Sequence, residues 1–210
     1  MATQLRIARL TLVQAKVIFM QPEGRQKKLE AFGRGPGLLS EALRKCPKKM
    51  WLYRPAPDRW SIHEIILHLA DSEAEAYVRC RQFIAQPGSP ALVYDASLWA
   101  SSLGYFHQST REALSLIMRL RKMTFQILRY IPDTVWAHTA QHPKKGTMTL
   151  NGWLDLQLSH IPHHIEQIHE NHAEWAKTHR QRKPAVRLVA ASAAKEVAIA
   201  SFGRTVEFGD

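Results

Sequence analysis

The sequence predicts an all-α protein built as a four-helix bundle. Two segments open with the same capping signal, a serine followed three residues later by a glutamate: Ser61 with Glu64, and Ser109 with Glu112. Apolar residues then recur at every third or fourth position, which is the period of a helix with one buried face. The chain has 210 residues, a length that suits one domain with a single core.

Four helices are expected in order along the chain. The first begins near Pro36, and the others cover residues 61–86, 109–131 and 150–175. The connection 87–108 is too long for a tight antiparallel turn, so it predicts a crossover that leaves the second and third helices parallel. Residues 133–148 are a candidate for a small hairpin.

The formal net charge of +11 is concentrated at the two ends of the chain. Residues 1–27 form a basic N-terminal extension that is either disordered or reflects a mis-assigned start, with Met20 as the alternative. Residues 177–210 form a basic C-terminal extension, and residues 28–176 are expected to form the bundle. This central part is near neutral and lacks a basic stripe with interleaved aromatic residues, so specific nucleic-acid binding is not expected.

Cysteine usage and hydropathy indicate a cytoplasmic protein without membrane association. The two cysteines, Cys46 and Cys80, form neither a CxxC pair nor a disulfide framework. No stretch approaches the roughly 18–20 uninterrupted apolar residues of a membrane helix. The basic residues 1–22 lack a secretory cleavage site.

Histidines cluster on the expected fourth helix. His160 and His164 lie one turn apart on the same face, so both imidazoles can reach one metal ion. A third ligand has to come from elsewhere. His68, at the edge of the second helix's apolar face, is the candidate, and His63 is its rival. Spacing alone does not separate a metal site from a solvated group of histidines.

A family resemblance favours the metal site. The stretch Trp60-Ser61-Ile62 leading into HLADSE, with HIPHHIEQI later in the chain, resembles the DinB-like superfamily, in particular its YfiT-like metal-dependent hydrolases and thiol S-transferases. AFGRGPGLL and HPKKGTMTL are also similar to members of this group. The resemblance covers residues 30–175. It implies a four-helix bundle, a possible homodimer, and a metal ion held by His68, His160 and His164.

Three neutral histidines leave a coordination position open on a divalent ion, for which zinc or nickel is expected. Water in such a position becomes more acidic, which suits hydrolysis, activation of a thiol or polarisation of a carbonyl. Asp71 is the predicted catalytic base, with Glu75 on the same side of the helix. Asp71 could equally hold a ligand imidazole or face solvent. Gln167 either lines the pocket or has a packing role.

The sequence therefore predicts a metal-dependent hydrolase or a small-thiol S-transferase that acts on a small molecule. The thiol hypothesis, including a low-molecular-weight thiol as partner, rests on resemblance alone. The alternative is a non-catalytic metal-binding or stress-related bundle protein. An accessible pocket with an open coordination position favours catalysis, whereas a fourth protein ligand favours a structural metal.

Overall fold

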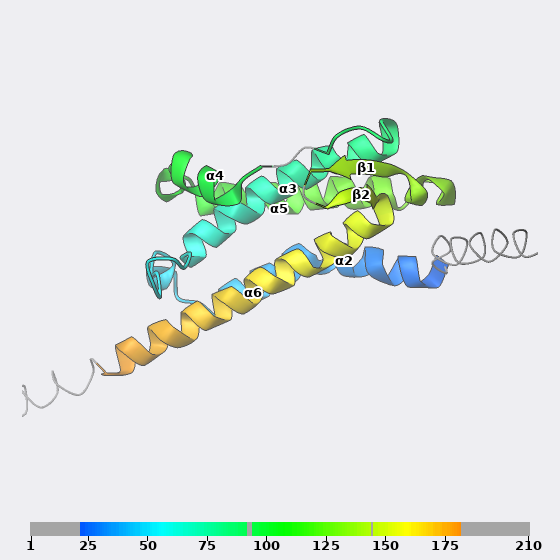
Figure 1. The fold of residues 1–210 in the computed structure, drawn as a ribbon. Coiled ribbons are helices and arrows are strands. Elements are labelled where there is room, and N and C mark those ends of the chain that lie inside the picture. Colours follow the sequence, from blue (N-terminus) through cyan, green and yellow to red (C-terminus); the bar gives the residue numbers. More distant parts are fainter. Residues whose placement is uncertain (1–21, 92–93, 144, 182–210) are drawn as a thin grey trace, which may run out of the picture.

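The computed structural model describes residues 22–91, 94–143 and 145–181, which form a bundle of four long helices (Figure 1). The predictions for residues 1–21 and 182–210 lie outside the described residues. The long helices are α2 (Pro22–Arg44), α3 (Ile62–Ala85), α5 (Thr110–Leu128) and α6 (Leu150–Gln181). The connections contain η1 (Lys48–Met50), α4 (Ala96–Ser102), η2 (Tyr105–His107), η3 (Asp133–Ala137), β1 (Thr139–His142) and β2 (Gly146–Thr149). The predicted four-helix bundle is confirmed.

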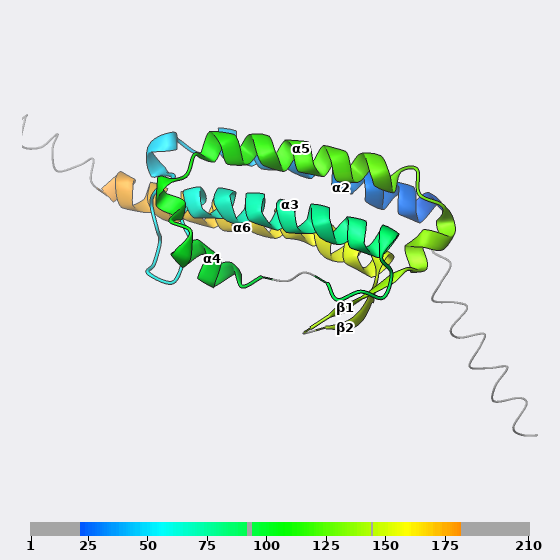
Figure 2. The same ribbon diagram turned by 90° about the horizontal axis from the view of Figure 1, so that it is seen from above.

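Helices α3 and α5 run in the same direction, and α2 and α6 run in the opposite one (Figure 2). Side-chain contacts agree with this arrangement. Near the first turn of α3, His63 Nε2 lies 2.8 Å from the carbonyl of Tyr105, just before α5 begins. Further along both helices, Glu73 pairs with Arg121. The prediction of a crossover between two parallel helices is therefore confirmed.

The prediction that the first helix begins near Pro36 is wrong, because α2 begins at Pro22. The early turns of α2 are packed: Leu29 and Phe32 are buried. Arg25 forms an ion pair with Asp133, the first residue of η3. The Arg25 guanidinium also lies 5.1 Å from the centre of the Trp136 ring. Helix α2 thus runs through the predicted domain boundary at residue 27.

The glycines around Pro36 mark close helix contacts rather than the start of a helix. A Cβ atom added to Gly33 would lie 3.3 Å from the Phe125 ring on α5. A Cβ atom added to Gly35 would lie 3.1 Å from Cδ1 of Ile161 on α6. The lack of side chains at Gly33 and Gly35 lets α2 approach α5 and α6 closely. These contacts outweigh the low helix propensity of glycine.

Pro36 also determines how a buried charge is satisfied. Because proline has no N–H, the carbonyl of Phe32 loses its helical donor. Arg121 Nη1 donates to that carbonyl at 3.2 Å, while Arg121 Nε donates to Glu73 at 2.9 Å. The guanidinium carbon lies 3.9 Å from the centre of the Phe32 ring. Arg121 and Glu73, each 2% exposed, therefore join α2, α3 and α5 in the bundle core.

Strands β1 and β2 form an antiparallel hairpin, which confirms the small hairpin predicted in this region. Thr139 pairs with Thr149, and Gly146 begins β2 with a φ of 70°, a conformation that glycine adopts without strain. The hairpin is tied to the crossover, because the Ala91 N–H donates to the Gln141 carbonyl at 2.9 Å. The crossover and the hairpin thus form one continuous layer beside the bundle.

Two further sequence expectations concern chemistry rather than topology. Cys46 and Cys80 are both buried and unpaired, as the lack of a disulfide framework predicts. Within residues 22–91, 94–143 and 145–181, no helix combines the length and the hydropathy of a membrane span.

Removing the buried guanidinium should destabilise the bundle. Arg121→Met leaves the Glu73 carboxylate buried without a counter-charge, so we expect a loss of roughly 3–5 kcal/mol in the free energy of unfolding. The double variant Glu73→Leu/Arg121→Met removes both charges and should recover much of that loss. Urea unfolding measures both, with the exposed Arg119→Met on the same helix as the control. An Arg121→Met protein as stable as this control would contradict the prediction.

Candidate metal centre

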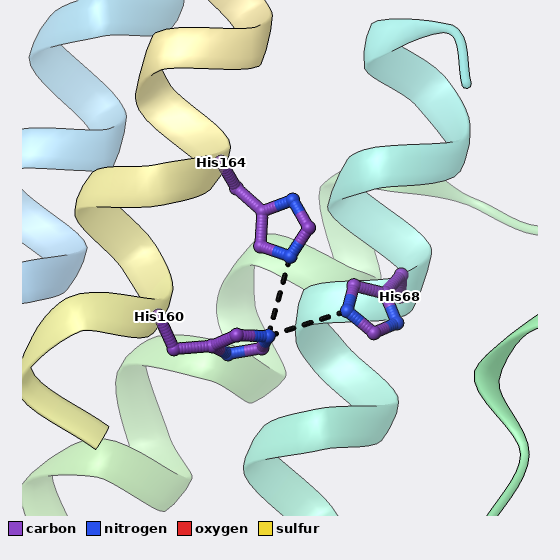
Figure 3. A group of neighbouring side chains, drawn as sticks. All are labelled: His68, His160 and His164. Atoms are coloured by element: carbon purple, nitrogen blue, oxygen red, sulfur yellow. Dashed lines mark hydrogen bonds between the residues drawn. The ribbon is translucent and has the colours of Figure 1, made fainter. Parts of the chain in front are cut away.

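Three imidazoles from two helices point toward one another (Figure 3). The capping box of Ser61 and Glu64 sets where α3 begins, and His68 follows on the face turned toward α6. His160 Nε2 lies 3.3 Å from His68 Nε2 and 3.2 Å from His164 Nε2. The three potential ligand atoms all lie within 4.8 Å of one another. The structure therefore brings together the three histidines that the sequence singled out.

The site holds these imidazoles in their neutral form. Burial, together with the neighbouring histidines, lowers the pKa of His68 and of His160 to about 3. Burial also lowers the pKa of His164 to about 4, although its hydrogen bond to Gln167 opposes this shift. At neutral pH each ring thus carries one proton and one nitrogen lone pair.

Hydrogen bonds at the opposite ring nitrogens decide which lone pairs face the centre. His164 Nδ1 lies 2.8 Å from Gln167 Oε1, an atom that only accepts, so Nδ1 carries the proton and Nε2 is bare. His68 Nδ1 lies 3.4 Å from the hydroxyl of Tyr94, which also bonds the Ser72 hydroxyl. Such partners fix the tautomer and orientation of metal-binding histidines. The described residues that line the cavity do not include Gln167, and its amide oxygen instead contacts His164.

Two of the three separations between the histidine nitrogens match those around a tetrahedral divalent cation, and all three nitrogens lie within 4.8 Å of one another. A tetrahedral zinc ion bonded to imidazole nitrogens at roughly 2.0–2.1 Å holds them roughly 3.3 Å apart. The two measured separations around His160 Nε2, 3.2 and 3.3 Å, match this value. Bare lone pairs at such a distance repel each other unless a cation or a proton lies between them. The donor set and its geometry can therefore hold a metal ion.

Trp60 covers one side of the three histidines. Its ring centre lies 4.7 Å from that of His68, and it stacks on His164 at 6.5 Å with an interplanar angle of 13°. Asn171, 1% exposed, donates from Nδ2 to the Trp60 carbonyl at 2.8 Å. This contact ties the segment before α3 to α6, so the indole is held over the imidazoles.

A cavity of about 880 Å³ opens on another side of the site. It lies between α3, α6, the crossover and the hairpin, and its walls include His68 and His160. Polar side chains from all four elements face it, among them Ser72, Tyr94, His142 and His163. Its volume is in the range of small-molecule sites, so a ligand of that size can reach the histidine nitrogens.

The structure places the two acidic residues of the predicted site, Asp71 and Glu75, in different surroundings. The Asp71 carboxylate accepts a hydrogen bond from the Tyr105 hydroxyl, and burial raises its pKa even though this bond opposes the shift. The described residues that line the cavity include Glu75 but not Asp71. His63, the rival ligand, bonds the Tyr105 carbonyl and lies outside the three-histidine group.

Some residues of the site were missed in the sequence. Ser72 lies four residues after His68, on the same helix face, so spacing alone could have identified it. Tyr94 lies in the crossover, where no periodic pattern or motif marks it. His138 and His142 have the same four-residue spacing as His160 and His164, but they lie just before and at the end of strand β1, respectively, and only His142 lines the cavity.

Comparisons with known proteins agree with the fold. The sequence profile of the DinB superfamily matches residues 31–168. A protein of Oceanobacillus iheyensis, named as a candidate metal-dependent hydrolase, is 30% identical over 109 residues, 52% of this chain and 63% of that protein. Bacillus subtilis YfiT, named in the same way, is 27% identical over 112 residues, 53% of this chain and 63% of YfiT. The chain thus spans less than two thirds of the length of these relatives.

The solved structure of Bacillus subtilis YfiT, described as a probable metal-dependent hydrolase with an unusual four-helix bundle topology, also matches. The TM-score is 0.70, with 22% sequence identity over 75% of this chain and 91% of that one. At this level of identity the likeness establishes the shared fold.

Gln167 should matter for metal binding although it is not a ligand. Gln167→Ala removes the acceptor of His164 Nδ1, and loss of such a partner typically costs 10–100-fold in metal affinity. Zinc titration of the protein without a histidine tag measures the change. The exposed neighbour Glu166→Ala is the control and should bind zinc like the unaltered protein. Equal affinities of the two variants would show that Gln167 does not orient His164.

The metal-free protein should lose stability as the pH falls below about 6.5. In the unfolded chain the histidines take up protons near pH 6.5, but in the folded chain the three buried histidines do so only near pH 3–4. Acid therefore favours unfolding within this window, and stability is complete above it. Urea midpoints between pH 7.5 and 4.5 test this. A variant with all three histidines changed to glutamine should show a shallower decline, and parallel curves would refute the explanation.

Proposed function

This chain belongs to the DinB superfamily, and we propose that it is a metal-dependent hydrolase that acts on a small molecule through His68, His160 and His164. One observation carries the proposal: three neutral imidazoles direct their nitrogens to one point on the wall of an open cavity. The names of the relatives from Oceanobacillus iheyensis and Bacillus subtilis support the same activity.

Zinc or nickel is the metal that we propose. The donor set consists of imidazoles alone. Imidazole binds late divalent metals better than it binds magnesium or calcium. When bound, such an ion would supply a Lewis acid on the wall of the cavity, and three protein ligands would leave it a further coordination position. The open position is the reason to prefer an enzyme over a bundle in which the metal only stabilises the fold.

Residues beside His68 can stabilise negative charge on a substrate. Burial raises the pKa of Tyr94, so its hydroxyl keeps its proton at neutral pH. Its hydroxyl and that of Ser72 bond each other beside His68 and the cavity, which leaves the pair one hydroxyl proton to donate to a substrate. Donors fixed in this way stabilise an oxygen that becomes negative during hydrolysis. Trp60 excludes water from the covered side of the site.

We propose a structural role for Asp71 in place of the catalytic role expected from the sequence. Its carboxylate accepts the Tyr105 hydroxyl, which holds η2 against α3. Glu75 does line the cavity, but it lies two helical turns from His68, roughly 10 Å along the axis. A general base has to come within hydrogen-bond reach of the proton it removes, so neither carboxylate is placed for that step.

Transfer of a small thiol to an electrophile is the second candidate. A cavity of about 880 Å³ has room for two small reactants, and imidazole-bound late metals accept thiolates. The two activities differ in one requirement, because hydrolysis proceeds without a thiol. We further propose a homodimer in the cytoplasm, where the two buried thiols stay reduced. Light scattering of the full chain tests the dimer.

Each of the three histidines should be required for metal binding and for hydrolysis. His68→Ala, His160→Ala or His164→Ala should weaken zinc and nickel binding by more than about tenfold, since even loss of an orienting partner costs that much. Metal analysis of the tag-free protein, followed by hydrolysis of p-nitrophenyl acetate with and without added thiol, measures both effects. His169→Ala, on the exposed side of α6, is the control. A His68→Ala protein that still holds one ion per chain would sink the proposal.

A further inference from the structure

A polar stripe runs along the face of α3 that borders the cavity. His68, Ser72, Glu75 and Arg79 follow each other at intervals of four, three and four residues, which places them on one face of the helix. They are 6%, 8%, 7% and 8% exposed, while most other buried residues of α3 are apolar. Burying charged side chains is costly unless they meet partners. The partners of this stripe therefore bear on what the cavity binds.

The distal half of the stripe is an ion pair between Glu75 and Arg79. It forms part of the cavity wall two turns from His68, roughly 10 Å along α3. Both charged groups border the cavity. A bound molecule that brings one charge of each sign can therefore extend this pair into a four-charge arrangement.

The charges on the cavity wall are balanced. Among the described residues that line it, Glu75 and Asp95 are acidic, and Arg79 and Lys145 are basic. A purely anionic ligand would meet Glu75, and a purely cationic one would meet Arg79. The wall thus complements a group that carries an ammonium and a carboxylate on neighbouring atoms.

We propose that the substrate carries a free α-amino acid group, with its carboxylate at Arg79 and its ammonium at Glu75. Its reacting group then lies at the three histidines, at the other end of the stripe. This inference rests on the proposed function and adds a substrate class to it. Charge-assisted hydrogen bonds of this kind are stronger than neutral ones, so the group contributes both affinity and orientation.

Four hydroxamates of equal chain length test the proposal on the zinc-loaded full chain. A hydroxamate binds zinc, and the far end of each probe differs: 2-aminosuberic acid 8-hydroxamate carries both charges, suberic acid monohydroxamate a carboxylate, 8-aminooctanohydroxamate an ammonium, and octanohydroxamate neither. Isothermal titration calorimetry should show the first binding at least about tenfold more tightly than the others, equal to roughly 1.4 kcal/mol.

Variants assign this preference to the ion pair. Glu75→Gln and Arg79→Gln should each reduce it, and the double variant, which leaves no unpaired buried charge, should abolish it. Octanohydroxamate should bind all of them equally, which verifies that the fold and the zinc site are intact. The control is Glu174→Gln, which removes an acid from an exposed ion pair with Lys177, away from the cavity lining.

The outcomes separate the two proposals. Equal affinity of the four probes, or a preference that survives in the double variant, would overturn the assignment of the substrate class and leave the metal-dependent hydrolase in place. A protein that binds no zinc, or binds zinc but not octanohydroxamate, would overturn the proposed function and this inference together.

Discussion

A buried guanidinium holds the bundle in the arrangement that the histidine site needs. Arg121 bonds Glu73 on α3 and the Phe32 carbonyl on α2, so one side chain of α5 fixes three helices. The fourth helix packs beside it, since Gly35 admits Ile161, the residue that follows His160. The Arg121 charge also acts on the site, because after burial and His164 it is the next cause that lowers the pKa of His160. Arg121 thus contributes both to core packing and, after burial and His164, to keeping His160 neutral.

Much of this fold is readable from local signals, and the failures have a common cause. Capping boxes and a 3.6-residue period are local properties, so they predict where the helices after residue 61 begin. Helix α6 continues to Gln181, beyond the predicted end at residue 175. Gly35-Pro36 is also a local signal, and it was taken for the start of a helix. Inside the bundle, contacts with α5 and α6 outweigh it, and the carbonyl that Pro36 leaves unpaired meets Arg121. Local chemistry predicts an element only until tertiary contacts supply the missing partner.

In the histidine site, too, local sequence signals predict some residues and tertiary contacts determine the others. His160 and His164 are linked by helical spacing, and His68 is marked by its place at the edge of its helix's apolar face. The resemblance to a family then favours a metal site over a solvated group of histidines. Asp71 was chosen because it is close in sequence, but three residues turn a helix by 300°, which leaves Asp71 about 60° away from His68. Glu75 lies only about 20° away, on the face that borders the cavity. On its flank of α3, Asp71 meets Tyr105, a partner 34 residues distant in sequence that no local pattern reveals.

The parallel arrangement of α3 and α5 explains why a cavity exists beside this site at all. Parallel neighbours cannot be joined by a short turn, so the chain has to cross back along the bundle, and this crossover brings Tyr94 to His68. The Ala91 to Gln141 hydrogen bond joins the crossover to the hairpin, which adds a second wall. Helix α3 therefore faces the apolar core on one side and a polar enclosure on another. That division allows a single helix to carry core residues, a proposed metal ligand and a buried ion pair together.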